Sequence, residues 1–132
     1  AVSVPVFGSG DIFSVELAKR MIDKTDCDGL VVARGACGNP WLMRDIENYL
    51  SDGSPPPPRS LQCRLETLKQ HLTLVERLCE IRGSGKIGFM RKIAQWYIHG
   101  FPTARRLRNE ITYIRSYSRL MSLIDGITPT SV

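Results

Sequence analysis

The pattern of hydrophobic positions along the chain changes in character near residue 58. Before that point, the apolar runs over 2–7 and 30–33 each lead into a stretch with apolar residues at helical spacing. Continuous β-branched runs of this length are typical of strands buried in a parallel sheet. After it, apolar residues recur every three or four positions. The pattern predicts a strand-helix-strand-helix region followed by a wholly helical region.

Capping residues place the helices of the first region. Ser14 is an expected N-cap for a helix that runs to about Thr25. Asn39 followed by Pro40 predicts an N-cap with proline at the first helical position, and this helix continues through Leu50. Because a helix separates the two strands, the sheet is expected to be parallel.

Four consecutive prolines, at positions 55–58, separate the two regions. Such a run cannot be helical and favours an extended polyproline spacer. We expect residues 54–59 to be a linker between a first part over 1–53 and a helical domain over 60–132. The helical domain is predicted to hold a long helix over 61–81, a second over about 87–99, a third capped by Thr103 and a short fourth capped by Ser118.

Two parallel strands are not expected to stand alone, because their outer edges are unpaired. A complete (β/α)8 TIM barrel has eight strands and about 250 residues. We therefore expect residues 1–53 to be the C-terminal end of such a barrel, and the chain to be the C-terminal portion of a longer protein. The predicted fold class is α/β plus all-α: two parallel strands with helices, then a small helical bundle. The strand edges are expected to pair with the missing N-terminal barrel part or with a second copy.

Small residues follow both predicted strands. Val6-Phe-Gly-Ser-Gly-Asp-Ile12 ends the first strand, and Val32-Ala-Arg-Gly-Ala36 ends the second. Small residues let the backbone approach a ligand, and a helix that follows directs free N–H groups at an anion. Two such loops on neighbouring parallel strands predict a two-sided phosphate site, as in barrels that hold a phosphorylated cofactor.

Composition narrows the class of protein. Hydrophobic residues make up 42% of the chain and charged residues 23%, which is typical of a globular protein. No apolar run approaches the ~20 residues of a membrane span. The four cysteines lack metal-ligand spacing and are interpreted as reduced thiols of a cytoplasmic protein: Cys27, Cys37, Cys63 and Cys79. For Cys37, which lies near the second loop, a small buried thiol is favoured over a functional one.

The net charge of +5 is unevenly distributed. Residues 1–58 contain five Lys or Arg and eight Asp or Glu, whereas residues 59–132 contain thirteen and five. A basic half joined to an acidic half is typical of a protein whose basic half meets a polyanion. A solvated basic surface that only aids solubility fits the charge as well, so charge alone leaves both open.

Four segments resemble one family. Val4-Pro-Val-Phe-Gly-Ser-Gly-Asp-Ile12 and Asp28-Gly-Leu-Val-Val-Ala-Arg-Gly-Ala-Cys-Gly-Asn-Pro-Trp41 look like the last two strands of tRNA-dihydrouridine synthases. Phe89-Met-Arg-Lys-Ile-Ala-Gln-Trp-Tyr97 and Gly100-Phe-Pro-Thr-Ala-Arg-Arg-Leu-Arg108 resemble the helical domain that follows the barrel in those enzymes. The resemblance extends from about Val4 to Ile124, and Arg-Gly-Ala-x-Gly-Asn-Pro-Trp is its most specific element.

This resemblance implies an FMN-dependent oxidoreductase that uses NADPH to reduce uridine to 5,6-dihydrouridine in tRNA, with a cysteine as proton donor. It places Ser9, Gly10 and Asp11 in a first loop that offers backbone N–H groups to the FMN phosphate. Ala33 and Arg34 fall in the second loop, where Arg34 is expected to pair with the phosphate. The family commonly has Asn in place of Ser9 and Gly in place of Ala33, and backbone N–H donation survives both changes.

The resemblance also puts the catalytic cysteine and the flavin-contacting lysine on earlier strands that this sequence lacks. None of the four cysteines lies in a matching motif, so we expect the chain alone to be inactive. Two alternatives stay open. One is another FMN-dependent TIM-barrel oxidoreductase, such as a dihydroorotate-dehydrogenase-like enzyme, and the other is a non-catalytic RNA-binding module.

Basic residues of the helical domain are candidates for nucleic-acid contact. Arg91 and Lys92 can share a face of the predicted second helix; Arg105, Arg106 and Arg108 follow on the next one. Each taken singly is better explained as a solvated charge, but a cluster on rigid elements suits a phosphate-tracking surface. Together with the resemblance, the cluster favours tRNA. Of the neighbouring aromatic residues, Trp96 is assigned to the core, and Tyr97 is left open between the core and base stacking.

Overall fold

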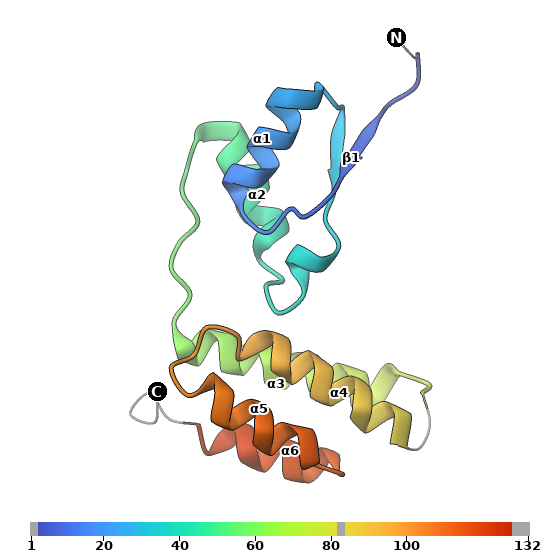
Figure 1. Ribbon diagram of the computed structural model, residues 1–132, viewed down its shortest axis with the longest axis vertical. Helices are drawn as coiled ribbons and strands as arrows, with labels where there is room; N and C mark the ends of the chain where they lie inside the picture. The colour runs from blue at the N-terminus through green and yellow to red at the C-terminus, as the bar shows by residue number, and fades with distance from the viewer. Residues whose placement is uncertain (1–2, 82–83, 128–132) are drawn as a thin grey trace. The chain divides into compact units, whose positions relative to one another are not determined.

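The computed structural model describes residues 3–81 and 84–127, which fall into two compact units divided between Pro58 and Arg59 (Figure 1). Residues 53–60 contain neither helix nor strand. Each unit has a hydrophobic core of its own, so each is described by itself.

The first unit holds a two-stranded parallel sheet, which confirms the predicted pairing. β1 (Phe7–Ser9) pairs with β2 (Gly29–Val31). α1 (Val15–Thr25) connects the strands and packs on both of them and on α2 (Leu42–Asp52) (Figure 1). A short 3-10 helix, η1 (Arg34–Ala36), follows β2. The buried core of this unit consists of Ile12, Val15, Ala18, Leu42 and Ile46.

The strands differ from the prediction in position and in burial. β1 begins at Phe7, at the end of the run expected over 2–7, and Val2 lies outside the described residues. The second strand covers 29–31 rather than 30–33. The expectation of buried strands is wrong, because Phe7 is 63% exposed and Val31 is 48% exposed. Leu30 and Val32 pack on the helical core, and side chains that alternate to the opposite face of the strands meet water.

Helix starts in the first unit confirm one predicted cap and correct another. Ser14 caps α1, since its Oγ accepts a hydrogen bond from the Leu17 N–H at 3.3 Å. α2 has Trp41 rather than Asn39 as its N-cap. The Asn39 carbonyl oxygen accepts a hydrogen bond from the Leu42 N–H (3.2 Å), which closes a turn before the helix begins.

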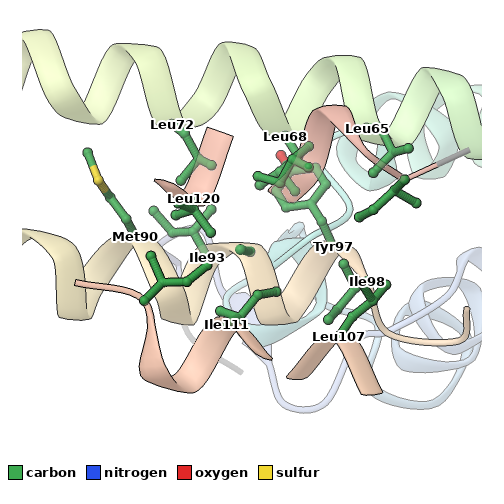
Figure 2. Close-up of a cluster of buried hydrophobic side chains, with 14 of the residues drawn as sticks. Leu65, Leu68, Leu72, Met90, Ile93, Tyr97, Ile98, Leu107, Ile111 and Leu120 are labelled. Carbon is green, nitrogen blue, oxygen red and sulfur yellow. The ribbon is translucent and has the colours of Figure 1, made fainter. Parts of the chain in front are cut away.

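Within residues 59–81 and 84–127, the second unit contains four helices: α3 (Leu61–Leu78), α4 (Ser84–Tyr97), α5 (Ala104–Tyr113) and α6 (Tyr117–Asp125) (Figure 1). All four contribute to one core (Figure 2), in which Leu68, Ile93, Ile111 and Leu120 are inaccessible to water. Burying a side chain of this size contributes about 1.5–3 kcal/mol. Tyr97 belongs to this core, and the half-buried Trp96 packs against it.

The helix boundaries of the second unit differ from the expected ones. α3 ends at Leu78 rather than near residue 81, and α4 begins at Ser84 rather than near residue 87. Thr103 is the N-cap of α5, but its side chain makes no capping hydrogen bond. Ser116, not Ser118, caps α6, because the Ser116 Oγ accepts a hydrogen bond from the Arg119 N–H at 3.4 Å.

Polar side chains connect α3 to α4 and the turn that follows it. Arg64 Nη2 donates hydrogen bonds to the carbonyl oxygens of Tyr97 (2.5 Å) and His99 (2.8 Å), and its guanidinium lies 4.5 Å from the centre of the Phe101 ring. Burial lowers the pKa of Arg64. The Tyr97 hydroxyl is 3.3 Å from His71 Nδ1, and burial lowers the pKa of His71 and raises that of Tyr97.

Candidate functional site

The two predicted loops meet at the carboxyl edge of the strands. Ser9, Gly10 and Asp11 end or follow β1, while Ala33 and Arg34 follow β2, and all five are exposed. Arg34 Nη2 forms an ion pair with Asp11 Oδ1, which joins the loops across 23 positions of sequence. Parallel strands end at the same edge of a sheet, so residues this far apart in sequence come together there.

Gly35 brings the backbones of the two loops into contact. A Cβ placed on Gly35 would lie 1.8 Å from the carbonyl oxygen of Ile12 and 3.0 Å from Leu42 Cδ2. Only glycine fits this close approach without moving the first loop. The sequence analysis did not single out Gly35. The glycine directly after Arg34 is the feature of the sequence that could have indicated this close contact between the loops.

The turn after β1 uses two consecutive residues with positive φ. Gly10 has φ +146°, and Asp11 has φ +45°. Glycine adopts such angles freely, and aspartate tolerates the left-handed region better than most residues do. This turn leaves the Asp11 carboxylate in contact with Arg34.

The ion pair between the loops is open to water. The side chains of Arg34 and Asp11 are 77% and 65% exposed, so their attraction contributes little to stability. A guanidinium at such a position can exchange one oxyanion partner for another, and a phosphate accepts two parallel hydrogen bonds from it. The arrangement can therefore hold a phosphate at Arg34, with Asp11 as the competing anion.

Residues 3–81 and 84–127 contain neither a cluster of metal-ligating side chains nor a helix that could span a membrane. This part of the chain has no group of three or more His, Cys, Asp or Glu side chains placed to hold a metal ion. None of its helices is both long and apolar enough to cross a membrane. Cys27 is buried, whereas the expectation of a buried Cys37 is wrong: that thiol is exposed, because it follows η1 at the open edge of the strands.

Four of the five predicted basic residues have exposed side chains. Arg105, Arg106 and Arg108 are exposed on α5, outside its buried stripe of Ala104, Leu107 and Ile111. The Arg106 Nε is 3.4 Å from Glu110 Oε1. Lys92 on α4 is exposed, with its Nζ 5.5 Å from the centre of the Trp96 ring. These side chains have the charge and the access that phosphate contact requires.

Arg91 has a different environment from the other four. It is half-buried, and its Nη1 donates hydrogen bonds to the carbonyl oxygens of Thr112 (2.6 Å) and Ile114 (3.5 Å). These carbonyls lie at the C-terminal end of α5, where a cation complements the helix dipole. Arg91 therefore joins α4 to the end of α5, and less of its guanidinium is free for a ligand.

The pattern of charges missed two arginines that the structure leaves exposed. Arg115 and Arg119 lie at the junction of α5 and α6, beside the exposed ring of Tyr113. One feature of the sequence could have indicated them: the excess of basic over acidic residues after residue 58 continues beyond Arg108. Spacing alone could not place them together, because they flank a helix start that was predicted two residues late.

Comparison with known proteins gives a family match over nearly the whole chain. Residues 1–127 match the family model described as dihydrouridine synthase (Dus). The chain is 33% identical over 129 residues to the "Probable tRNA-dihydrouridine synthase" of Mycobacterium tuberculosis (strain CDC 1551 / Oshkosh), covering 97% of this chain and 32% of that protein. It is 34% identical over 125 residues to "tRNA-dihydrouridine synthase B" of Shewanella oneidensis, covering 94% of this chain and 38% of that protein. The chain spans about a third of the length of the curated relatives it matches.

Proposed function

Because this chain belongs to the dihydrouridine synthase family, we propose that it is part of an FMN-dependent tRNA-dihydrouridine synthase. The complete enzyme reduces uridine to 5,6-dihydrouridine in tRNA, with NADPH as the source of electrons. Residues 1–53 are the C-terminal end of its flavin-binding TIM barrel, and residues 60–132 are its tRNA-binding domain. The activity belongs to the complete protein, of which this chain supplies the phosphate loops and the basic helical bundle.

One observation carries the flavin half of the proposal: the contact of Arg34 with Asp11 between loops that follow two parallel strands. The residues fit the phosphate end of FMN, because an exposed guanidinium, a glycine turn and the close approach at Gly35 meet at one edge. When bound and reduced by NADPH, FMN would supply the hydride that reduces uridine. Arg34 would exchange Asp11 for the phosphate of FMN, and the loop of Ser9 and Gly10 would contribute backbone N–H groups.

The exposed strand faces support the barrel assignment. Strands of a TIM barrel are covered on both faces, by helices outside and by layers of side chains inside. In this chain Phe7 and Val31 are large apolar residues in water, while Leu30 faces the helices. We propose that neighbouring strands of the barrel cover these residues in the complete enzyme.

The charge of the second unit supports the tRNA half. Lys92, Arg105, Arg106 and Arg108 are exposed on α4 and α5, in a unit whose basic residues outnumber its acidic ones by thirteen to five. Contacts of this kind supply sequence-independent affinity for phosphates. None of the four cysteines is proposed as the proton donor, since none lies in the matching motif. Catalysis therefore requires residues beyond those of this chain.

Binding of unmodified tRNA across a salt series tests the proposal. The 132-residue chain is expected to bind tRNA more tightly than duplex DNA of equal charge, with an affinity that falls steeply as salt rises. Equal, weak binding to both nucleic acids would show that the second unit binds them only through its net positive charge.

For the flavin half, the complete enzyme carrying Arg34→Gln is expected to retain less FMN after purification than the unmodified enzyme. Unchanged retention would contradict the role of Arg34.

A further inference from the structure

Tyr113, at the C-terminal end of α5, is the most exposed large hydrophobic residue in the described part of the chain, at 81%. The other described tyrosines of this unit are used in packing. Tyr97 is buried, and the Tyr117 hydroxyl lies 3.2 Å from Thr73 Oγ1. The fold therefore gives no structural reason for an aromatic ring at position 113.

Tyr113 lines a groove of about 440 Å³ at the junction of α5 and α6. The groove also has apolar walls, from Ile114 and Leu123, and two cations, Arg115 and Arg119. A second pocket of about 230 Å³ shares Glu110, Arg119 and Leu123 with it and continues between the two helices. The surface is thus an elongated hollow with an aromatic ring at one end.

The two arginines of the groove are available to a ligand. Arg115 and Arg119 are exposed, and within residues 3–81 and 84–127 neither side chain forms an ion pair. The acidic residue of the groove, Glu110, pairs with Arg106, whose Nε lies 3.4 Å from its carboxylate. The groove therefore presents two free guanidinium groups next to one exposed ring.

We propose that this groove binds an unpaired nucleotide of RNA, with its base stacked on Tyr113 and its phosphate held by Arg115 and Arg119. Aromatic rings bind bases through stacking, and guanidinium groups bind phosphates with parallel hydrogen bonds. The bases of a duplex are stacked on each other and do not offer a face to Tyr113, so the nucleotide must come from a loop or a single-stranded end. The inference rests on the proposed function, because it takes tRNA as the source of that nucleotide.

Two residues of the proposed basic surface, Arg105 and Arg108, lie outside this groove and the pocket that continues it. Successive residues of an α-helix are 100° apart, so Arg105 and Arg108 share the flank of α5 that carries Thr112. Thr112 Oγ1 accepts a hydrogen bond from the Gln95 side chain, which places that flank beside α4. Arg106, in contrast, lines the pocket toward α6. Variants in the groove therefore test a different contact from variants on the α4 flank.

Binding of a single-stranded oligouridine of about ten nucleotides, compared with duplex RNA of equal charge, tests the proposal. Tyr113→Leu is expected to weaken oligouridine binding about tenfold and to leave duplex binding unchanged, whereas Tyr113→Phe keeps the ring and the affinity. Arg115→Gln and Arg119→Gln are each expected to reduce the slope of log affinity against log salt by up to about 0.7. The matched controls are Leu78→Ala and Arg77→Gln, at exposed positions of α3 outside the groove, and both are expected to bind as the wild type does.

A 2-aminopurine base within the oligouridine gives a direct readout of stacking. Its fluorescence is expected to be quenched by the wild type and by Tyr113→Phe, and not by a saturating concentration of Tyr113→Leu. The proposal is overturned if Tyr113→Leu binds oligouridine like the wild type, or loses duplex and single-strand affinity equally. In either case tRNA binding by the wild type would leave the proposed function standing. If the wild type binds neither tRNA nor oligouridine, the proposed function and this inference are both overturned. If the groove instead binds a protein selectively, only this inference is overturned.

Discussion

The two units differ in how completely they enclose their hydrophobic residues. In the second unit, four helices share a core in which Leu68 and Ile93 are inaccessible to water. In the first unit, helices cover one face of two short strands, and Phe7 and Val31 on the strands meet water. The second unit is closed and carries its charge outside. The first unit has an exposed strand edge, where its two loops meet through Arg34 and Asp11.

This difference fits the roles proposed for the two units. A closed bundle can hold exposed arginines on rigid helices, as a surface for a large polyanion requires. An open strand edge places loop residues where further strands can complete a pocket for a small phosphorylated ligand. Substitutions in the two units are therefore expected to have different consequences.

The largest effect is expected from Leu68→Ala in α3. This substitution leaves a cavity in a closed core and is predicted to lower the free energy of unfolding by about 2–5 kcal/mol. Phe7→Ala in β1 removes a larger side chain, but that side chain is 63% exposed, and the predicted loss is less than about 1 kcal/mol. Urea unfolding followed by circular dichroism measures both. Equal losses of unfolding free energy in the two variants would contradict the difference in burial between the two units.

Arg64→Met is the next largest perturbation. The variant keeps most of the side-chain stem but removes the hydrogen bonds to the carbonyl oxygens of Tyr97 and His99. Hydrogen bonds from a charged group contribute about 1.5–3 kcal/mol, so a loss of this size is expected in urea unfolding. Arg77→Met, at an exposed position of the same helix, is the control and is expected to change stability by less than about 0.5 kcal/mol. A similar loss in both variants would show that Arg64 acts only as a surface charge.

Gly35→Ala tests the contact between the two loops of the first unit. The new Cβ requires the Ile12 carbonyl to move, at a cost of about 1–3 kcal/mol. Hydrogen exchange is expected to accelerate in peptides from the first unit and to stay unchanged in α3 to α6. Gly126→Ala is the control, since its Cβ would meet no atom closer than 3.5 Å. Unchanged exchange in the first unit of Gly35→Ala would refute the close approach.

The smallest effect is a pH dependence at His71. Burial lowers the pKa of His71, so the unfolded chain takes up this proton at a higher pH than the folded chain does. Its contribution to stability is therefore present above the unfolded pKa of about 6.5 and is lost as pH falls toward the folded value. His71→Gln cannot take up the proton and is expected to flatten the decline of stability below about pH 6.5. The same decline in His71→Gln as in the wild type would contradict this, and His99→Gln at an exposed position is the control.

Contacts that follow from topology could be predicted from the sequence, whereas contacts that depend on packing could not. The loops that carry Asp11 and Arg34 were expected to form one site because they follow neighbouring parallel strands, and this ion pair joins them. Arg91 has the pattern of a surface cation, yet it donates to carbonyl oxygens 21 and 23 positions away. Gly35 is constrained by a carbonyl from the other loop, which no local pattern reveals.

Local patterns also leave a choice between equivalent residues. Ser116 and Ser118 have the same propensity to cap a helix, and the end of α5 determines which of them precedes α6. The apolar run over 2–7 has the composition of a strand, but pairing begins only at Phe7, opposite Gly29. Element types were therefore predictable, while their exact limits depended on partners elsewhere in the chain.

The proposed roles of the two units are best tested by tRNA binding to two variants of this chain. One carries Arg105→Gln, Arg106→Gln and Arg108→Gln in the second unit, and the other carries Arg34→Gln in the first. Fluorescence anisotropy across a salt series gives the Kd of each. We predict that the triple variant binds tRNA more weakly, with a slope of log affinity against log salt reduced by about 2–3, and that Arg34→Gln binds as the wild type does. Wild-type binding by the triple variant, or an equal loss in Arg34→Gln, would contradict the account.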